Sequence, residues 1–166
     1  MNIIAAADKN FGIGYKGQLL AHIKEDMRFF KEMTTGKAVI MGRETFLSFP
    51  NQKPLADRKN FVLTTNPQFN REGITVCSSL EEAIEEAKKD FSSEDIFFIG
   101  GERVYKESIK YANKAYITKI DKEFKADRFI INFDKEKNWQ IESEREVNCE
   151  NGLKITFTLY KKSISE

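Results

Sequence analysis

Short apolar segments alternate with amphipathic segments along most of the chain, and this alternation constrains the fold more than any other feature. Apolar runs at 2–7, 37–42 and 95–101 are typical of strands buried on both faces of a parallel sheet. Between such runs, segments such as 22–33 and 78–90 carry apolar residues at helical spacing. Strands that alternate with helices predict an α/β fold with a doubly wound, mostly parallel sheet.

The other elements follow from the same criteria. Further strands are expected at 60–65, 73–77 and 114–121, further helices at 43–49 and 102–112, and a loop with three glycines at 8–18. Ser79 and Glu82 have the spacing of a capping box at the start of one helix. Near the C-terminus, alternation with period two follows a turn-like segment at 149–152, at Leu153, Ile155, Phe157 and Leu159. This pattern predicts the last strand of an antiparallel C-terminal hairpin at one edge of the sheet.

The composition indicates a single domain and excludes several classes of partner. A chain of 166 residues with 40% hydrophobic residues is long enough to bury one core. The 27 basic and 26 acidic residues leave a net charge of +1, so we expect no nucleic-acid or membrane partner. Cys77 and Cys149 form no CxxC pair and lie in no histidine cluster. We therefore expect a reduced, cytoplasmic protein without a metal site.

One carboxylate stands on the apolar side of a predicted helix. Ile23, Met27, Phe30 and Met33 recur at helical spacing, which predicts one face turned toward a core, and at 100° per residue Asp26 lies on that same side. An unpaired charge there costs several kcal/mol or changes its pKa. Asp26 is therefore a candidate functional residue.

Three predicted strand ends carry groups that bind anions. Arg43 and Thr45 follow the strand that stops at Gly42, Arg103 follows the pair Gly100–Gly101, and Thr64 and Thr65 follow another strand. Helix starts, guanidinium groups and hydroxyls all suit phosphate. Each feature also has a simpler explanation: a solvated arginine, a glycine turn without ligand, or threonines that cap a turn. Taken together they indicate an extended, multiply phosphorylated ligand, although the Rossmann GxGxxG fingerprint is absent.

Six segments now identify a family resemblance. IIAAADKNFGIG, the helix with Asp26, VIMGRET, PLADRKNFVLT, IGGERVY and YITKID occur in this order, and VIMGRxT with IGGxxVY is a specific combination. From residue 1 to about 160 the chain resembles bacterial dihydrofolate reductase. The resemblance implies an eight-stranded, mostly parallel sheet with four flanking helices. It implies one domain over 1–166, in which about 37–90 form an adenosine-binding subdomain.

The resemblance also implies an activity. It is the NADPH-dependent reduction of 7,8-dihydrofolate to tetrahydrofolate in a monomeric enzyme, with hydride to C6 and a proton to N5. This reaction supports one-carbon metabolism and thymidylate synthesis, and antifolate inhibitors would share the pocket. Asp26 would hold the pterin and Thr118 would hydrogen-bond Asp26, while Arg58 would hold the α-carboxylate of the glutamate tail. The other substrate-side positions that match the family are Ile4, Ala5, Met27, Phe30, Phe49, Leu55 and Ile99.

The cofactor side is carried over in the same way. Gly100–Gly101 matches an unusual cis peptide, and Thr64, Thr65 and Arg43 would meet the adenosine 2′-phosphate, which favours NADPH over NADH. The full set of matching cofactor positions is Ala6, Ile13, Gly14, Gly42, Arg43, Glu44, Thr45, Leu63, Thr64, Thr65, Ile99, Gly100, Gly101, Arg103, Val104 and Tyr105.

The chain departs from the family pattern just before the catalytic helix. Most members have a Pro–Trp pair where this chain has Leu20 and Ala21, and its only tryptophan, Trp139, is expected in the core or the sheet. We expect a wider and wetter pocket mouth, and a surface cap role for His22. Two alternatives stay open at this point: a pterin- or nucleotide-binding protein without turnover, and a related reductase of pyrimidine precursors in riboflavin synthesis. Asp26 and Arg58 argue against the second.

Overall fold

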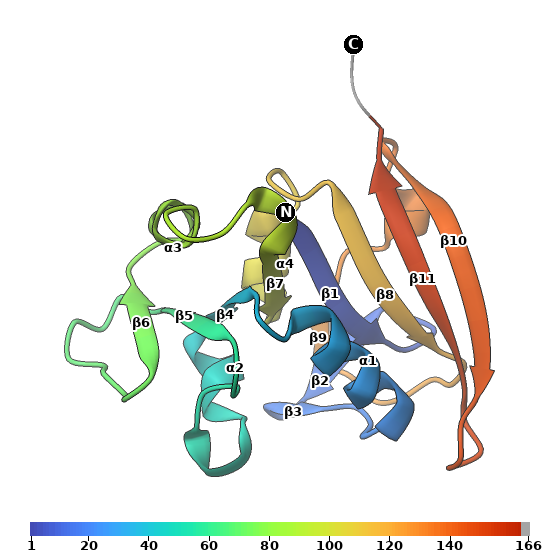
Figure 1. Ribbon diagram of the computed structural model, residues 1–166. Helices are drawn as coiled ribbons and strands as arrows, with labels where there is room; N and C mark the ends of the chain where they lie inside the picture. The colour runs from blue at the N-terminus through green and yellow to red at the C-terminus, as the bar shows by residue number, and fades with distance from the viewer. Residues whose placement is uncertain (164–166) are drawn as a thin grey trace.

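An eight-stranded mixed sheet forms the centre of the molecule (Figure 1). The computed structural model describes residues 1–163. The strand order across the sheet is β10-β11-β8-β1-β7-β4-β5-β6, and all neighbours from β8 to β6 are parallel. The strands are β1 (Asn2–Ala7), β4 (Ala38–Gly42), β5 (Lys59–Leu63), β6 (Ile74–Cys77), β7 (Ile96–Gly100), β8 (Lys114–Ile120), β10 (Trp139–Asn148) and β11 (Lys154–Lys162). The predicted α/β class, the mostly parallel sheet and its antiparallel C-terminal hairpin are confirmed.

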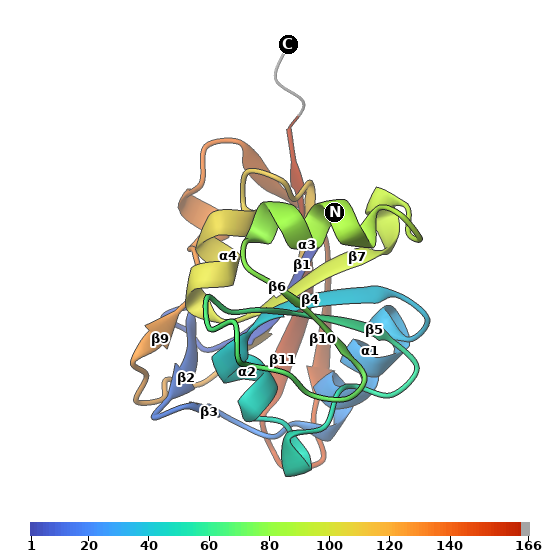
Figure 2. The same cartoon turned by 90° about the vertical axis from the view of Figure 1, so that its left-hand side faces the viewer.

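Helices cover both faces of this sheet (Figure 2). The four α-helices are α1 (Lys24–Thr34), α2 (Arg43–Leu47), α3 (Leu80–Ala87) and α4 (Glu102–Ser108), and single 3₁₀ turns occupy Pro50–Gln52, Ser93–Asp95 and Phe133–Lys135. α3 and α4 lie on one face, and α1 and α2 lie on the other. Two apolar clusters fill the layers. One joins β1, β7 and β8 to α3 and α4, and the other joins β4, β5 and β7 to α1 and α2.

The segment 8–18 differs from its prediction. It contains two short strands, β2 (Gly12–Tyr15) and β3 (Gln18–Leu19), which form a second, antiparallel sheet with β9 (Arg128–Phe129). Gly12 pairs with Phe129 and Gly14 with Arg128. The partner β9 lies more than 110 residues away, so no local pattern could indicate that pairing, whereas β3 pairs with β2 across a two-residue turn at Lys16 and Gly17.

The start of α3 confirms the predicted cap. Ser79 takes the N-cap position, and its hydroxyl accepts a 3.1 Å hydrogen bond from the backbone N–H of Glu82. The Glu82 carboxylate in turn accepts from the backbone N–H of Ser78 at 2.8 Å, so the reciprocal bond is displaced by one residue.

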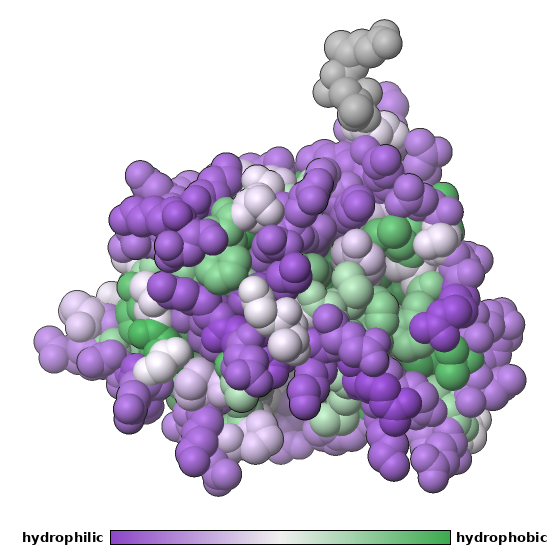
Figure 3. All heavy atoms as spheres, in the orientation of Figure 1, coloured by the Kyte–Doolittle hydropathy of each residue, from purple (hydrophilic) through white to green (hydrophobic). Residues whose placement is uncertain are grey.

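The predicted apolar face of α1 is only partly correct. Phe29, Phe30 and Met33 are half-buried against the sheet, but Met27 is 58% exposed. Phe29 makes the closest aromatic contact, with its ring centroid 4.6 Å from that of Phe157 on β11. On this face, green apolar side chains lie where α1 runs beside β8 and β11 (Figure 3). Phe29 follows Asp26 by three residues, so both side chains lie on the side of α1 that faces β8 and β11, while Met27 is turned toward solvent.

Other expectations concern single residues and the membrane. Trp139 is buried at the start of β10, against Phe133. Cys77 and Cys149 are both buried and free. Within residues 1–163, no helix is long and apolar enough to cross a membrane, and no group of three or more acidic, histidine or cysteine side chains could hold a metal ion.

Candidate active site

Asp26 and Thr118 meet on one face of the sheet. Asp26 lies in the first turn of α1, and Thr118 lies near the carboxyl end of β8. The Thr118 hydroxyl donates a hydrogen bond of 2.6 Å to Oδ1 of Asp26, and Thr118 itself is only 1% exposed. The fold therefore brings together the two residues for which the family resemblance predicted contact.

The environment of Asp26 is unusual for a carboxylate. Burial raises the pKa of Asp26 above its ordinary value, and the hydrogen bond from Thr118 opposes this rise. Within residues 1–163, no lysine, arginine or histidine forms an ion pair with Asp26, although nine ion pairs occur elsewhere. A half-buried carboxylate without a cationic side-chain partner is typical of a functional site.

Tyr105 connects this region to β1. Its ring is 4% exposed, and its hydroxyl donates a 2.8 Å hydrogen bond to the backbone carbonyl of Ile4. Burial and the nearby charge of Asp26 raise the pKa of Tyr105, so the phenol stays protonated. Tyr105 thus links α4 to the strand that carries Ile4 and Ala5.

The predicted apolar walls belong mostly to one cluster. This cluster contains Ile4 and Ile99 as buried members and Phe30, Phe49 and Leu55 as half-buried ones. Ala5 is half-buried and packs against the other cluster, on the α3 and α4 face. Met27 is exposed, as described above. Of the seven apolar positions expected on the substrate side, five therefore share one cluster.

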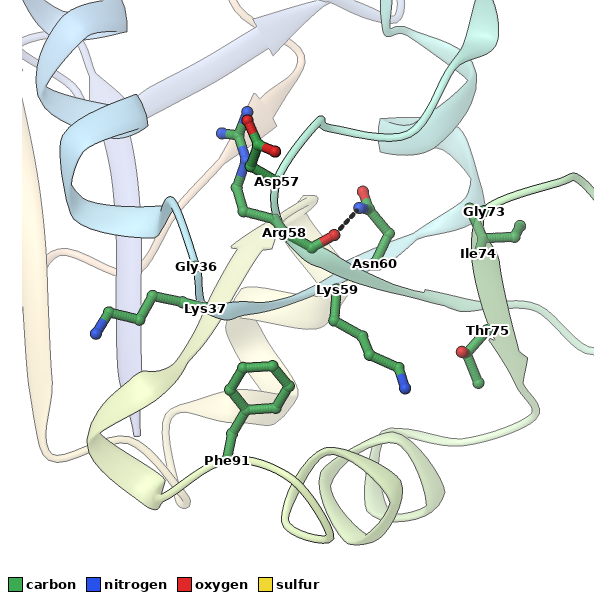
Figure 4. Close-up of a pocket in the computed structure, with 10 residues that line it drawn as sticks. All are labelled: Gly36, Lys37, Asp57, Arg58, Lys59, Asn60, Gly73, Ile74, Thr75 and Phe91. Carbon is green, nitrogen blue, oxygen red and sulfur yellow. Dashed lines mark hydrogen bonds between the residues drawn. The ribbon is translucent and has the colours of Figure 1, made fainter.

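Arg58 lies just before β5, in a segment that Asn60 holds. Its guanidinium donates to the carbonyl of Ala56 at 2.9 Å and to the Thr34 hydroxyl at 3.1 Å. The buried Asn60 donates to the carbonyls of Leu55 and Arg58, both at 3.0 Å. Figure 4 shows the bond to Arg58. These bonds direct Arg58 toward α1, where it lies 5.9 Å from the Phe30 ring centre. Arg58 is therefore positioned beside the apolar cluster.

A hollow of about 480 Å³ lies near Arg58 but does not contain the Asp26–Thr118 pair. It opens at the amino ends of β4, β5 and β6, among residues that include Lys37, Lys59 and Phe91. In Figure 4 the side chains of Arg58 and Lys59 point to opposite sides of the chain. Small-molecule sites in sheets of this kind lie beyond the carboxyl ends of strands, so we place the candidate site at Asp26 and not in this hollow.

Glycines stand at the carboxyl ends of β4 and β7. Gly100–Gly101 is a cis peptide, as the family resemblance predicts. A Cβ added at Gly100 would lie 3.3 Å from the Thr45 hydroxyl and 3.4 Å from the Tyr105 hydroxyl, and Gly100 has a φ of +129°. A Cβ at Gly42 would contact only Val104 and the same peptide, at 3.7–4.0 Å. These glycines therefore let the ends of β4 and β7 pack closely against Thr45, Tyr105 and Val104.

The charged and hydroxyl groups around these strand ends agree only in part with the predicted phosphate-binding site. Arg43 is half-buried at the start of α2, and its guanidinium lies 3.5 Å from Glu44. The Thr64 hydroxyl accepts from the backbone N–H of Asn66 at 3.1 Å, so it caps a turn. Arg103 was expected to face an anion, but its side chain is 88% exposed and bonds Glu107 one turn along α4 at 3.0 Å. The electrostatic argument from Arg103 is thus weaker than the sequence suggested, because an i,i+4 pair explains its position.

The departure at Leu20 and Ala21 lies beside a small apolar cluster. Ala21 packs against a cluster that includes Ile23, Ile120 and Cys149. His22 is exposed, as expected, but the N-cap of α1 is Ile23, and no side chain caps this helix. His22 is therefore a surface residue without the capping role.

Sequence reasoning missed Asp8, at the end of β1. Asp8 is only 3% exposed, and its carboxylate accepts hydrogen bonds from three backbone N–H groups. The one available signal was its place between an apolar strand and a glycine-rich segment that contains Ile13 and Gly14. Ile13 and Gly14 lie on β2, and Ile13 packs against the apolar cluster on the α3 and α4 face. Ala6 lies on β1.

This geometry defines a class of protein: an α/β protein with a half-buried acid, held by Thr118, near the carboxyl end of β8 and with glycines at the carboxyl ends of β4 and β7. A family model described as dihydrofolate reductase matches residues 1–162. The chain belongs to the dihydrofolate reductase family.

Relatives support this membership over nearly the whole chain. A dihydrofolate reductase of Bacillus subtilis is 38% identical, over 99% of this chain and 96% of its own length. One from the moth Heliothis virescens is 36% identical, over 98% and 97%. The solved structure of the Enterococcus faecalis enzyme, complexed with NADP(H) and RAB-propyl, superposes with a TM-score of 0.86 at 29% identity and covers 98% of this chain and 96% of its own. NADPH-dependent reduction of dihydrofolate is accordingly the function of this chain.

Proposed function

We propose that the chain reduces 7,8-dihydrofolate to 5,6,7,8-tetrahydrofolate at the Asp26–Thr118 pair, and so supplies one-carbon metabolism and thymidylate synthesis. The observation that carries this assignment is the 2.6 Å hydrogen bond between Thr118 and a carboxylate that no cationic side chain within residues 1–163 neutralises. A ring nitrogen and an exocyclic amino group of a pterin are the paired donors that such a carboxylate accepts.

Thr118 and Asp26 have different roles in this proposal. The Thr118 hydroxyl occupies Oδ1, so it fixes the orientation of the carboxylate before substrate arrives. Asp26 then binds the pterin, and its negative charge favours the protonated form of the substrate. We infer that a water delivers the proton to N5, while Asp26 acts through its charge. NADPH supplies the hydride that reaches C6.

The rest of the substrate contacts the apolar cluster and Arg58. Ile4, Phe30, Phe49, Leu55 and Ile99 belong to one cluster beside which Arg58 is held. A guanidinium forms two parallel hydrogen bonds to a carboxylate, which suits the glutamate tail of the substrate. We also keep Met27 in this set, because an apolar side chain that is 58% exposed next to Asp26 on α1 is available to a ligand.

The cofactor is assigned to the carboxyl ends of β1, β4, β5 and β7. Gly42, Gly100 and Gly101 place backbone without side chains at these strand ends, and the Thr45 hydroxyl lies 3.3–3.4 Å from the Cβ positions of Gly100 and Gly101. Arg43, Thr64 and Thr65 would hold the 2′-phosphate, and Ile13, Gly14 and Ala6 would contact the nicotinamide. Residues 37–90 carry β4, β5, β6, α2 and α3, and we propose them as the adenosine-binding subdomain.

The test of this proposal is the absorbance of NADPH in the presence of the purified chain. Steady loss of absorbance that begins only on addition of dihydrofolate is the expected result. Binding of NADPH without consumption would instead select a binding protein that lacks turnover. Arg43→Ala should raise the KM for NADPH and leave that for NADH nearly unchanged, because only NADPH carries the 2′-phosphate.

Three finer properties belong to the same proposal: a monomeric state, a cytoplasmic location and inhibition by antifolates. Two buried, free thiols suit a reducing compartment. The Enterococcus faecalis relative was solved with the compound RAB-propyl. Light scattering would measure the mass in solution against 19.2 kDa for one chain.

A further inference from the structure

The carboxylate of Asp8 joins two segments that are far apart in the sequence. Its Oδ1 accepts hydrogen bonds from the backbone N–H groups of Asn10 at 2.9 Å and Gly12 at 2.8 Å. Its Oδ2 accepts from the backbone N–H of Phe124 at 3.0 Å. One oxygen therefore holds the turn from β1 into β2, and the other holds the segment that follows β8.

Only a carboxylate can satisfy this arrangement. Asp8 is 3% exposed, and no cationic side chain within residues 1–163 pairs with it, so its charge is balanced by backbone dipoles alone. An ionised carboxyl group accepts on both oxygens, whereas an amide of the same size would direct an NH₂ group at one of the donors. An acidic side chain buried at this junction is thus matched to three converging donors.

The two segments that Asp8 joins flank the proposed nicotinamide contacts. Ala6 lies two residues before Asp8 on β1, and Ile13 follows directly after Gly12 on β2. The same segments also meet through the ladder of β2 with β9 and through the bond from the Asp127 N–H to the Gly14 carbonyl at 2.9 Å. Asp8 adds a buried side-chain connection to these backbone contacts, at the end nearest β1.

We infer that Asp8 is a positioning residue for the cofactor. It fixes β2, and with it Ile13 and Gly14, relative to β1 and to the segment after β8, so the nicotinamide side of the site is formed before the ligand binds. This inference rests on the proposed function of the site. Asp8 contacts no reacting atom; it acts through the backbone that it holds.

The first test is Asp8→Asn. If the oxygen of the introduced amide keeps the bonds to Asn10 and Gly12, the NH₂ group of that amide faces the Phe124 N–H, and the side-chain bond to the segment after β8 is lost. We expect the Kd for NADPH to rise about tenfold, because a smaller fraction of the protein is ready to bind. The Kd for dihydrofolate should stay within about twofold, since the Asp26 pocket is unchanged. In the ligand-free protein, the Phe124 amide should exchange its hydrogen faster than in the parent.

A matched control separates positioning from stability. Asn2 lies at the other end of β1, is 4% exposed, and donates to the carbonyls of Glu94 and Ile96 at 2.8 and 3.2 Å. Asn2→Ala should lower the melting temperature without changing the Kd for NADPH or the exchange of the Phe124 amide. Equal losses of affinity for NADPH in both variants would overturn the inference.

If Asp8→Asn does not fold, Gly12→Ala serves as a second variant, because it perturbs the same junction. A Cβ at Gly12 would lie 2.7 Å from the Ala126 Cβ and 3.0 Å from Asp8 Oδ1, so it forces the two segments apart. The same selective loss of NADPH affinity is expected. Unchanged NADPH affinity in a folded variant, or an equal loss for both ligands, would reject the role of Asp8. A parent protein that binds no NADPH would instead reject the proposed function itself.

Discussion

The hydroxyl of Thr118 on β8 donates a 2.6 Å hydrogen bond to Asp26 on α1, across 92 positions of sequence. This contact places a carboxylate on the sheet with one oxygen engaged and no cation beside it within residues 1–163. The arrangement determines how several substitutions should act on activity, pH dependence and stability.

Asp26→Asn should reduce kcat by about 100-fold at neutral pH, because the charge that favours the protonated substrate is removed. The loss of NADPH absorbance with saturating dihydrofolate measures this effect. Asp121→Asn is the control, since Asp121 follows β8 but is exposed and pairs with Lys9 at 3.2 Å. Kinetics of Asp26→Asn equal to those of the parent would refute the assigned role.

The same substitution should make the protein more stable at neutral pH. Burial raises the pKa of Asp26 in the folded state above its value of 3.8, so the folded protein holds this proton more tightly than the unfolded chain does. The contribution of Asp26 to stability is therefore fully present below pH 3.8 and is lost as the pH rises through the raised pKa. Melting temperatures of Asp26→Asn and the parent should differ at about pH 7 and converge in acid. A parent that melts higher at neutral pH would contradict this sign.

Thr118→Val should shift the acid limb of the pH profile of kcat/KM to higher pH. The hydrogen bond from Thr118 lowers the pKa of Asp26, so its removal lets burial raise this pKa further. Thr118→Ser keeps the hydroxyl and is the matched control. The prediction fails if the two variants give the same profile.

Arg58→Lys should raise the KM for dihydrofolate about tenfold and leave kcat nearly unchanged, because an ammonium cannot form the paired hydrogen bonds of a guanidinium. A dihydropterin without a glutamate tail should show no such increase. Arg71→Lys is the control, since Arg71 also stacks on a phenylalanine, 4.7 Å from the Phe69 ring centre, but is exposed. An equal effect on both substrates would place the tail elsewhere.

Ala21→Trp should tighten pterin binding, because the family resemblance predicts that a tryptophan at this half-buried position packs beside the substrate. Titration of the variant with an antifolate measures the change in Kd. Leu19→Trp adds the same side chain at a nearby position that is 64% exposed, and should have no effect. Weaker or unchanged affinity in Ala21→Trp would count against the idea of a wider pocket mouth.

The sequence predicted the parallel sheet well because its strands are buried on both faces and stand out as apolar runs. Val39, Ile40 and Met41, for example, are fully buried in β4, as their uninterrupted run indicates. The short sheet of β2, β3 and β9 was not predicted. The pairing of β2 with β9 joins distant segments and has no local pattern, whereas the hairpin of β2 and β3 has a local one, the turn at Lys16 and Gly17, that was overlooked.

Within the site, the structure supports a prediction best where a residue is chemically out of place. Asp26 stood out because its charge contradicts its apolar side of the helix, and Thr118 bonds it as expected. Arg103 stays a prediction, because Glu107, four residues later, already pairs with its charge. Asp8 was overlooked because its partners are backbone N–H groups, which every residue but proline possesses.

The position of β8 between β1 and β11 has a consequence for folding during synthesis. β11 follows β8 in the chain and pairs with it along seven registered residues, among them Thr118 opposite Phe157. A growing chain that has emerged only to Asn148 contains every residue assigned to substrate and cofactor, yet β8 still lacks a neighbour on one side. Dihydrofolate or NADPH should therefore stabilise the nascent protein only weakly until β11 has paired with β8. Tight binding of either ligand by the nascent chain would then indicate that the sheet is complete.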